Sequence, residues 1–194
     1  GGTAGASAGG MSGTGGVGGQ AGGMSGTGGG GGLPPSCMKF PSGTSLIAPT
    51  DGRLHCYWAH GNQIDWNSAE TVCETEGGTL VTILSEAENA AVVQLAIGTN
   101  LFMGLNMSGQ VFIGATDGKD LNDRSGPGDY AWVTGEAWGY ENWHDGQPDG
   151  ACMNCGSSGF GCSCDHRGAI ASDGTWYDRT ETTMRPFICE AIAP

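Results

Sequence analysis

Oxygen-bearing side chains occur in two short motifs near the end of the chain. Gln147-Pro148-Asp149 comes first, and Trp176-Tyr177-Asp178 follows across a glycine- and cysteine-rich stretch. Calcium takes six to eight oxygen ligands from such carboxylate and amide groups. A proline between two polar ligands fits a rigid turn, in which a cis bond would aim both side chains the same way. These residue types therefore indicate a site for one hard cation.

Four cysteines, Cys152, Cys155, Cys162 and Cys164, lie in the stretch between the two motifs. A structural zinc site needs four thiolates, and the pair Cys152-x2-Cys155 supplies two of them at a usual spacing. The alternative is two local disulfides, each joining one of Cys152 and Cys155 to one of Cys162 and Cys164. The chain has eight cysteines, an even number, which favours disulfides and an oxidising compartment.

Two helices are predicted in the first half of the cysteine-containing region. Asn67-Ser68-Ala69-Glu70 has the pattern of a capping box, and Gly77-Gly78 ends the helix that it opens. Ser85-Glu86-Ala87-Glu88 opens the second helix in the same way. Apolar residues recur at helical spacing after it.

Short strands are predicted after these helices, because apolar and β-branched runs alternate there with Gly, Asp and Asn. The runs are 111–114, 130–133, 169–171 and 186–189. Such runs predict an antiparallel sheet. Helices followed by strands give an α+β fold class.

Composition divides the chain into two parts. Residues 1–36 are rich in Gly, carry no charge and contain one octet twice, at 9–16 and 22–29. Such a segment cannot bury enough apolar surface to order itself, so it is predicted to be a flexible linker. Residues 37–194 form the folded domain and hold the whole net charge of −13. This acidity argues against nucleic acid as a partner, and no apolar run is long enough to predict membrane insertion of the chain as given.

The order of motifs resembles the C-type lectin family from Cys37 to Glu190. The matching segments are Val111-Phe112-Ile113-Gly114, Tyr140-Glu141-Asn142-Trp143, Gln147-Pro148-Asp149, Asp173-Gly174-Thr175-Trp176 and Pro186-Phe187-Ile188-Cys189-Glu190. The resemblance implies a C-type lectin-like fold of two helices flanking small antiparallel sheets, with a long irregular loop stapled by disulfides. It also implies a central Cys73–Cys189 bridge and an N-terminal Cys37–Cys56 pair.

The family's principal calcium site, carried over by position, falls on Gln147, Asp149, Asp165 and Asp178. The same residues would hydrogen-bond a sugar that binds calcium. Tyr177 stands where the family has an Asn ligand, and both its ring and that of Phe160 are candidates for stacking on the sugar. In the family, Gln-Pro-Asp usually accompanies galactose or N-acetylgalactosamine, so the implied ligand is a galactose-type sugar.

Two departures from the family pattern are visible. The family's second conserved disulfide would fall at Arg167 and Glu181, so an ion pair replaces it, or the two are unrelated surface charges. At the family's accessory calcium site Asp117 fits one position, but Gly150 and His166 stand where acids are expected.

The Gly-rich linker is similar to the spacers of bacterial surface lipoproteins. These resemblances imply calcium-dependent carbohydrate binding in the extracellular space or at a bacterial cell surface, with the linker as a tether. The alternative is a calcium-independent domain that recognises a surface protein, and a third interpretation is a purely structural loop. No enzyme is predicted, because His144-Asp145 and Asp165-His166 lack a convincing nucleophile or general-base arrangement.

Overall fold

The computed structural model describes residues 37–38, 44–47, 52–103, 109–121, 123–153 and 162–193. The predicted linker over 1–36 lies outside these ranges, as do Cys155 and Phe160. No helix within the described ranges is long and apolar enough to cross a membrane.

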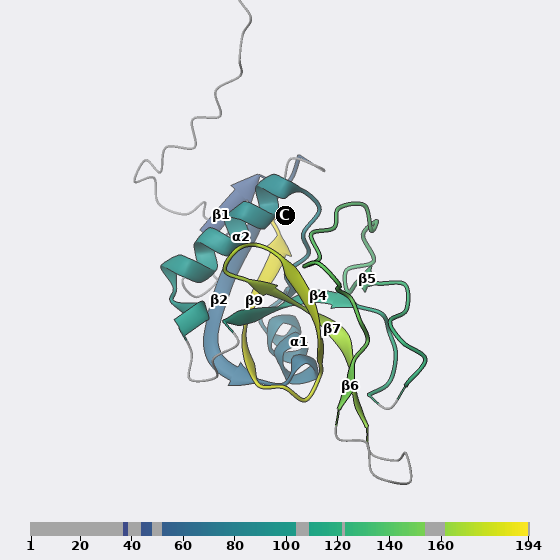
Figure 1. Ribbon diagram of the computed structural model, residues 1–194. Helices are drawn as coiled ribbons and strands as arrows, with labels where there is room; N and C mark the ends of the chain where they lie inside the picture. Colours follow the sequence, from purple (N-terminus) through teal and green to yellow (C-terminus); the bar gives the residue numbers. More distant parts are fainter. Residues whose placement is uncertain are drawn as a thin grey trace, which may run out of the picture. The chain divides into compact units, whose positions relative to one another are not determined.

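The described strands pair in the order β1-β2-β9-β4-β7-β6, with β3 on β9, β5 on β4 and β8 on β7 (Figure 1). Their bounds are β1 Thr44–Ile47, β2 Leu54–Ile64, β3 Thr79–Leu80, β4 Gln110–Thr116, β5 Ala131–Trp132, β6 Cys152–Met153, β7 Ser163–Ala171, β8 Trp176–Thr180 and β9 Arg185–Ile192. The neighbours pair antiparallel except β4 and β9, which run parallel through Phe112 and Phe187. The predicted antiparallel pairing therefore holds for the other strand pairs, and the α+β class is confirmed.

Helix α1 spans Trp66–Thr75 and helix α2 spans Glu86–Gly98. The predicted start of α2 is confirmed, because the Ser85 hydroxyl accepts from the backbone N–H of Glu88. The predicted start of α1 is wrong by two residues, since Asp65 caps this helix and accepts from the backbone N–H of Ser68. Glu70 reaches the backbone N–H of Leu80 instead, so a tertiary contact displaced the predicted capping box.

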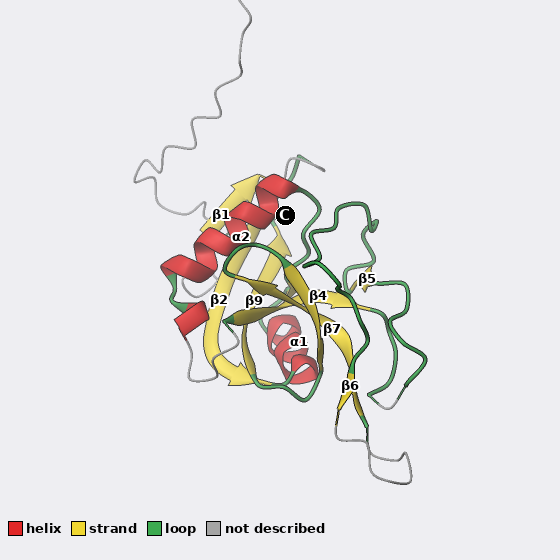
Figure 2. Cartoon of the chain, in the orientation of Figure 1, coloured by secondary structure: helices red, strands yellow, loops and turns green. Residues whose placement is uncertain are grey.

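Alternation along the central strands divides the core into two clusters, one under each helix. Ile188 of β9 faces a cluster that includes Val92 of α2, whereas Phe187 and Cys189 face one that includes Cys73 of α1. Successive side chains of a strand point to opposite faces, so one strand serves both clusters. Figure 2 shows most of the long loops together at one side of this core, around β5 and β6.

The disulfides agree with the pairings that the resemblance implied. Cys37 is bonded to Cys56, and Cys73 is bonded to Cys189. In the loop region Cys152 is bonded to Cys164, as their direct pairing in the β6–β7 ladder allows. Cys162 is also disulfide-bonded. The zinc alternative is wrong, because bonded sulfurs are not thiolate ligands.

An ion pair joins Arg167 to Glu181, which is the first of the two alternatives that the sequence left open for the place of the second family disulfide. The Nη2 atom of Arg167 lies 2.7 Å from Oε2 of Glu181, and both side chains are mostly buried. The Arg167 guanidinium also lies 5.1 Å from the centre of the Trp66 ring. The pair therefore ties β7 to the segment after β8 and packs against α1.

Buried acids on β9 and α2 predict that stability depends on pH. Burial raises the pKa of Glu190 to about 7, and neighbouring Glu88 adds to the rise while His55 opposes it. The unfolded chain releases this proton near pH 4.5, so stability present below pH 4.5 is lost as pH rises to 7. We expect the free energy of unfolding in chelator to fall by up to about 1 kcal/mol per pH unit in that window.

The Glu190→Gln variant tests this dependence, because glutamine keeps the shape and cannot ionise. Urea unfolding at several pH values should give a flatter slope for this variant than for the wild type. Glu74→Gln, which changes an exposed carboxylate, should keep the wild-type slope. Equal slopes for all three proteins would mean that Glu190 does not carry the effect.

Candidate cation and ligand site

The Gln147-Pro148-Asp149 turn is held against the start of β8. The backbone N–H of His144 donates to Trp176, and the backbone N–H of Gln147 donates back to His144. The peptide bond between Gln147 and Pro148 is cis, as the sequence allowed. These contacts bring the turn beside Asp178, although 29 residues separate Asp149 from it in the chain.

Three carboxylates converge at this turn. Asp149, Asp165 of β7 and Asp178 of β8 each place an oxygen within 4.8 Å of the others. Asp165 and Asp178 are buried, whereas Asp149 is exposed. Gln147 joins them by donating from Nε2 to Asp149 at 3.1 Å and accepting at Oε1 from the backbone N–H of Asp178. The structure thus brings together the four residues that the resemblance assigned to calcium.

The backbone of the turn fixes Asp178. Its two carboxylate oxygens accept from the N–H groups of Asp149 at 3.2 Å and Gly150 at 2.6 Å. Gly150 has a φ of +58°, and a Cβ there would lie 2.5 Å from the backbone nitrogen of Pro127. A side chain at position 150 would therefore push the turn away from Asp178.

The electrostatics of the cluster favour binding of a cation. Burial raises the pKa of Asp165 to about 6, and the negative charges of Asp178 and Asp149 add to the rise. Burial also raises the pKa of Asp178. The Oδ1 atom of Asp165 is buried and has no hydrogen-bond partner among the described residues. A bound cation would supply the missing partner and stabilise the charged carboxylates.

Two arginines near the cluster were not predicted from the sequence. Arg179 donates from Nη1 to the backbone carbonyl of Asp178 at 2.7 Å, and Arg179 and Arg185 both oppose the rise in the pKa of Asp165. Burial and the charge of Arg179 lower the pKa of Arg185 to about 10. The position of Arg179 directly after Asp178 was the available signal. These two charges offset the three carboxylates only in part.

Tyr177 projects away from the carboxylates. Alternation along β8 buries Trp176 and Asp178 on one face and leaves Tyr177 partly exposed on the other. Its ring stacks on His144 with centroids 4.7 Å apart, and the Arg179 guanidinium lies 4.7 Å from its centre. A sugar that stacked on Tyr177 would compete with these neighbours. Phe160, the other predicted stacking residue, lies outside the described residues.

Protein groups fill the position of the family's accessory calcium site. The carboxylate of Asp117 accepts from the backbone N–H groups of Lys119 and Gly128, and lies 2.9 Å from Nδ1 of His166. Gly150, the other departure, has no room for an acidic side chain for the reason given above. Three groups of the chain, two backbone N–H groups and the His166 ring, therefore already contact the Asp117 carboxylate.

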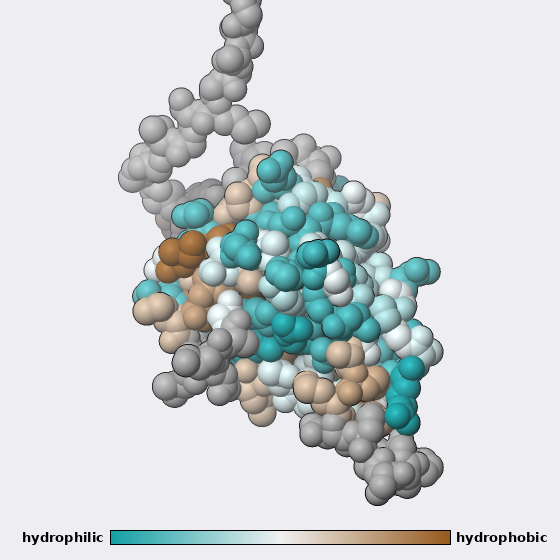
Figure 3. All heavy atoms as spheres, in the orientation of Figure 1, coloured by the Kyte–Doolittle hydropathy of each residue, from teal (hydrophilic) through white to brown (hydrophobic). Residues whose placement is uncertain are grey.

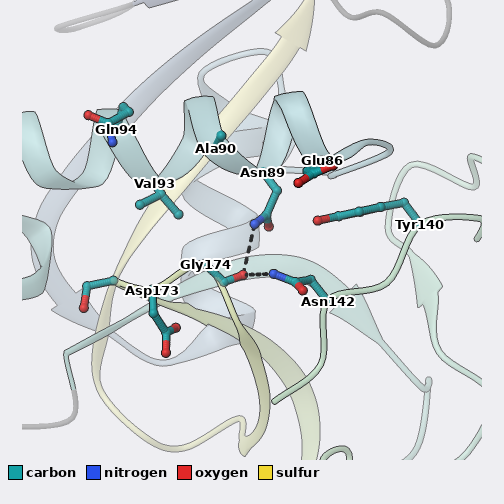
Figure 4. Close-up of a pocket in the computed structure, with 10 residues that line it drawn as sticks. Glu86, Asn89, Ala90, Val93, Gln94, Tyr140, Asn142, Asp173 and Gly174 are labelled. Carbon is teal, nitrogen blue, oxygen red and sulfur yellow. Dashed lines mark hydrogen bonds between the residues drawn. The ribbon is translucent and has the colours of Figure 1, made fainter. Parts of the chain in front are cut away.

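A polar pocket of about 440 Å³ lies between α2 and the turn before β8 (Figure 4). At its floor Asn89 and Asn142 both donate to the carbonyl of Gly174, and Asn89 accepts from the indole N–H of Trp176. These amides hold the beginning of β8 in place. Asn89 and Asn142 therefore position the strand that carries Asp178.

The donor set at the turn suits a hard cation. It consists of three carboxylates and one amide oxygen, which are the groups that calcium prefers. The face of the domain drawn in Figure 3 is mostly hydrophilic, and the chain is strongly acidic. Fold and site together define a binding domain in which a rigid sheet supports a disulfide-stapled loop.

Comparison with known proteins identifies the family. The family model described as the lectin C-type domain matches residues 62–191, more than half of the sequence. The chain belongs to the lectin C-type domain family.

Several curated relatives support this assignment. Lectin BRA-3 of Megabalanus rosa is 28% identical over 139 residues, which are 70% of this chain and 70% of that protein. The human C-type lectin domain family 10 member A is 30% identical over 140 residues, 70% of this chain but 36% of its own length. Mouse tetranectin is 28% identical, and the match covers 64% of it.

Solved structures share the fold. The carbohydrate-recognition domain of the mouse scavenger receptor C-type lectin has a TM-score of 0.55 at 23% identity, over 84% of this chain and all of that one. A calcium-independent type II antifreeze protein has a TM-score of 0.54 at 21% identity, over 80% of this chain and 95% of its own. The fold is therefore common to neighbours with different binding properties.

Proposed function

We propose that this domain binds carbohydrate through a calcium ion held by Gln147, Asp149, Asp165 and Asp178. The observation that carries the proposal is the convergence of three carboxylates in which the buried Oδ1 of Asp165 lacks a partner. Membership of a lectin family adds support. When bound, calcium would accept two neighbouring hydroxyl oxygens of the sugar.

The residues around the ion would orient the sugar. Asp149 is exposed, so its carboxylate is available to accept from a sugar hydroxyl. Gln147 offers an amide that can donate or accept. The order of amide and carboxylate in Gln147-Pro148-Asp149 underlies our proposal of a galactose-type sugar. Phe160 stays a proposed stacking residue, whereas Tyr177 does not, because its ring lies on the other face of β8 and packs on His144. Binding without chemical conversion of the ligand is proposed.

We further propose that the domain acts outside the cell or at the cell surface. Its described disulfides are stable in oxidising compartments. Residues 1–36 would then act as a flexible tether. The acidity of the chain argues against nucleic acid as a ligand.

A second candidate function is calcium-independent recognition of a surface protein. It is favoured by Arg179, whose guanidinium binds the Asp178 carbonyl and supplies positive charge beside the cluster. Tyr177, in place of an amide ligand, also fits this function. One solved neighbour is described as calcium-independent.

Titration calorimetry on the chelator-stripped protein separates the two functions. We expect calcium to bind with a dissociation constant of about 0.1 to 1 mM, as in other extracellular modules. Galactose added to the calcium-loaded protein should then give a larger response than mannose. Absence of calcium heat at millimolar concentration would instead support the second function.

A further inference from the structure

A second pocket, of about 520 Å³, adjoins the proposed calcium site. Its lining residues come from the loop before β5 and from the loop that leads into the Gln147-Pro148-Asp149 turn. They are Gly128, Asp129, Tyr130, Trp138, Glu141, Trp143, Gln147 and Pro148. Gln147 belongs to both sites, since its amide also contacts Asp149 and Asp178. A ligand that reaches beyond the turn on this side enters the pocket directly.

Aromatic rings form one wall of the pocket. Trp138 and Trp143 are both partly exposed, with ring centroids 6.3 Å apart. Tyr130 packs edge-on against Trp143 at 4.8 Å. The electron-rich face of an indole attracts the polarised C–H groups of a sugar and attracts cations more strongly. This wall therefore suits a sugar ring, with or without an amino group.

The hydroxyl of Tyr130 is buried beneath this wall. Tyr130 is only 8% exposed, and its hydroxyl oxygen has no hydrogen-bond partner among the described residues. Burial raises the pKa of this hydroxyl, and the charges of Asp178, Asp117 and Asp165 add to the rise. The hydroxyl therefore lies near these acids, and what the wall offers a ligand is aromatic ring surface.

The charge of the lining is entirely negative. Asp129 and Glu141 are exposed carboxylates, and none of the lining residues is Lys or Arg. Glu141 also accepts from the indole N–H of Trp138, so its carboxylate lies beside the aromatic wall. A carboxylate on the ligand would be repelled here, whereas an ammonium group would be attracted.

We propose that this pocket receives the second unit of a glycan whose first unit occupies the calcium site, and that it selects a neutral or amino sugar against an acidic one. The inference rests on the proposed function, because the first unit fixes the position of the second. It assigns to this domain a preference for at least a disaccharide.

Three disaccharides test the inference on the calcium-loaded full chain. Each has galactose linked to a different second unit, namely glucose, glucosamine or glucuronic acid, and free galactose is the reference. We expect the glucosamine disaccharide to bind about tenfold more tightly than galactose, the glucose disaccharide to fall between them, and the glucuronic acid disaccharide to gain nothing. Calorimetry measures all four affinities.

Two variants test whether the residues that line the pocket cause this preference among disaccharides. Asp129→Asn combined with Glu141→Gln should reduce the advantage of the glucosamine disaccharide over the glucose one, because the two carboxylates no longer attract the ammonium group and only the indole faces still do. Trp138→Ala should reduce every disaccharide to the affinity of galactose. Trp138 also packs on Trp132, with ring centroids 4.6 Å apart. Thermal unfolding of the Trp138→Ala variant is therefore measured as well. The Asp129→Asn, Glu141→Gln variant gives a result that does not depend on this packing. Glu136→Gln, outside the pocket, is the matched control and should behave as wild type.

The outcomes separate this inference from the proposed function. If galactose binds and the glucuronic acid disaccharide binds as tightly as the glucosamine one, the inference is wrong and the proposed function stands. The same holds if the preference is undiminished in the Asp129→Asn, Glu141→Gln variant. If neither galactose nor any disaccharide binds, the proposed function fails and this inference fails with it.

Discussion

An Asp165→Asn variant is expected to lose calcium affinity by about 100-fold or more while its fold stays intact, because one of three carboxylate charges disappears from the cluster. Without calcium, this variant should be at least as stable as the wild type at pH 8. The reason is that burial raises the pKa of Asp165 to about 6, so its charged form is unfavourable in the folded state above that pH. Titration calorimetry and thermal unfolding in chelator measure the two effects.

Asp145→Asn is the matched control for this prediction. Asp145 is an exposed carboxylate in the loop before the turn, outside the cluster of Asp149, Asp165 and Asp178. Its loss changes the net charge equally and should leave calcium affinity within about twofold, since exposed charges are screened. Equal losses in both variants would mean that calcium responds to overall charge rather than to this cluster.

Removing the Cys73–Cys189 disulfide is expected to have the largest effect on stability. The bond joins α1 to β9 across 116 residues, and both cysteines are fully buried. Closing a loop of that length restricts the unfolded chain by about 4 to 5 kcal/mol. Domains of this size are stable by about 5 to 15 kcal/mol. We therefore expect the Cys73→Ala, Cys189→Ala double variant to lose about 4 to 5 kcal/mol in urea unfolding, a large part of that total.

The Cys37–Cys56 pair provides the comparison, because its sequence separation is only 19. Removing it should cost about 3 kcal/mol in urea unfolding, clearly less than the central bond. A larger loss from Cys37→Ala, Cys56→Ala than from the central pair would contradict an explanation based on loop length. Packing of the buried residues under α1, which include all four of these cysteines, would then decide the loss of stability more than loop length does.

Local patterns in the sequence predicted the elements whose determinants are near neighbours. Ser85 and Glu88 lie within one turn, so the start of α2 is readable from the chain. The start of α1 was misplaced because Glu70, which looked like part of a cap, bonds to Leu80 across a tertiary contact. Strand β2 was missed because its segment includes polar residues such as His60 and Gln63 and lacks a clear alternating pattern.

The candidate site also has one part that local sequence predicts and another that depends on tertiary contacts. Gln147-Pro148-Asp149 is a local turn that can be recognised from its own three residues. The sequence by itself also determined the acidity of the chain and its even number of cysteines. Residue types alone already grouped Asp178 with this turn, but resemblance to a family was needed to add Asp165.

Only the tertiary structure decided which groups face one another. The β7–β8 pairing and the turn contacts placed the three carboxylates together, directed Tyr177 away from them and brought Arg179 to the Asp178 carbonyl. It also assembled the aromatic pocket from two separate loops. The physical reason is that strand register and loop packing bring together residues far apart in the chain, whereas sequence patterns report only on near neighbours.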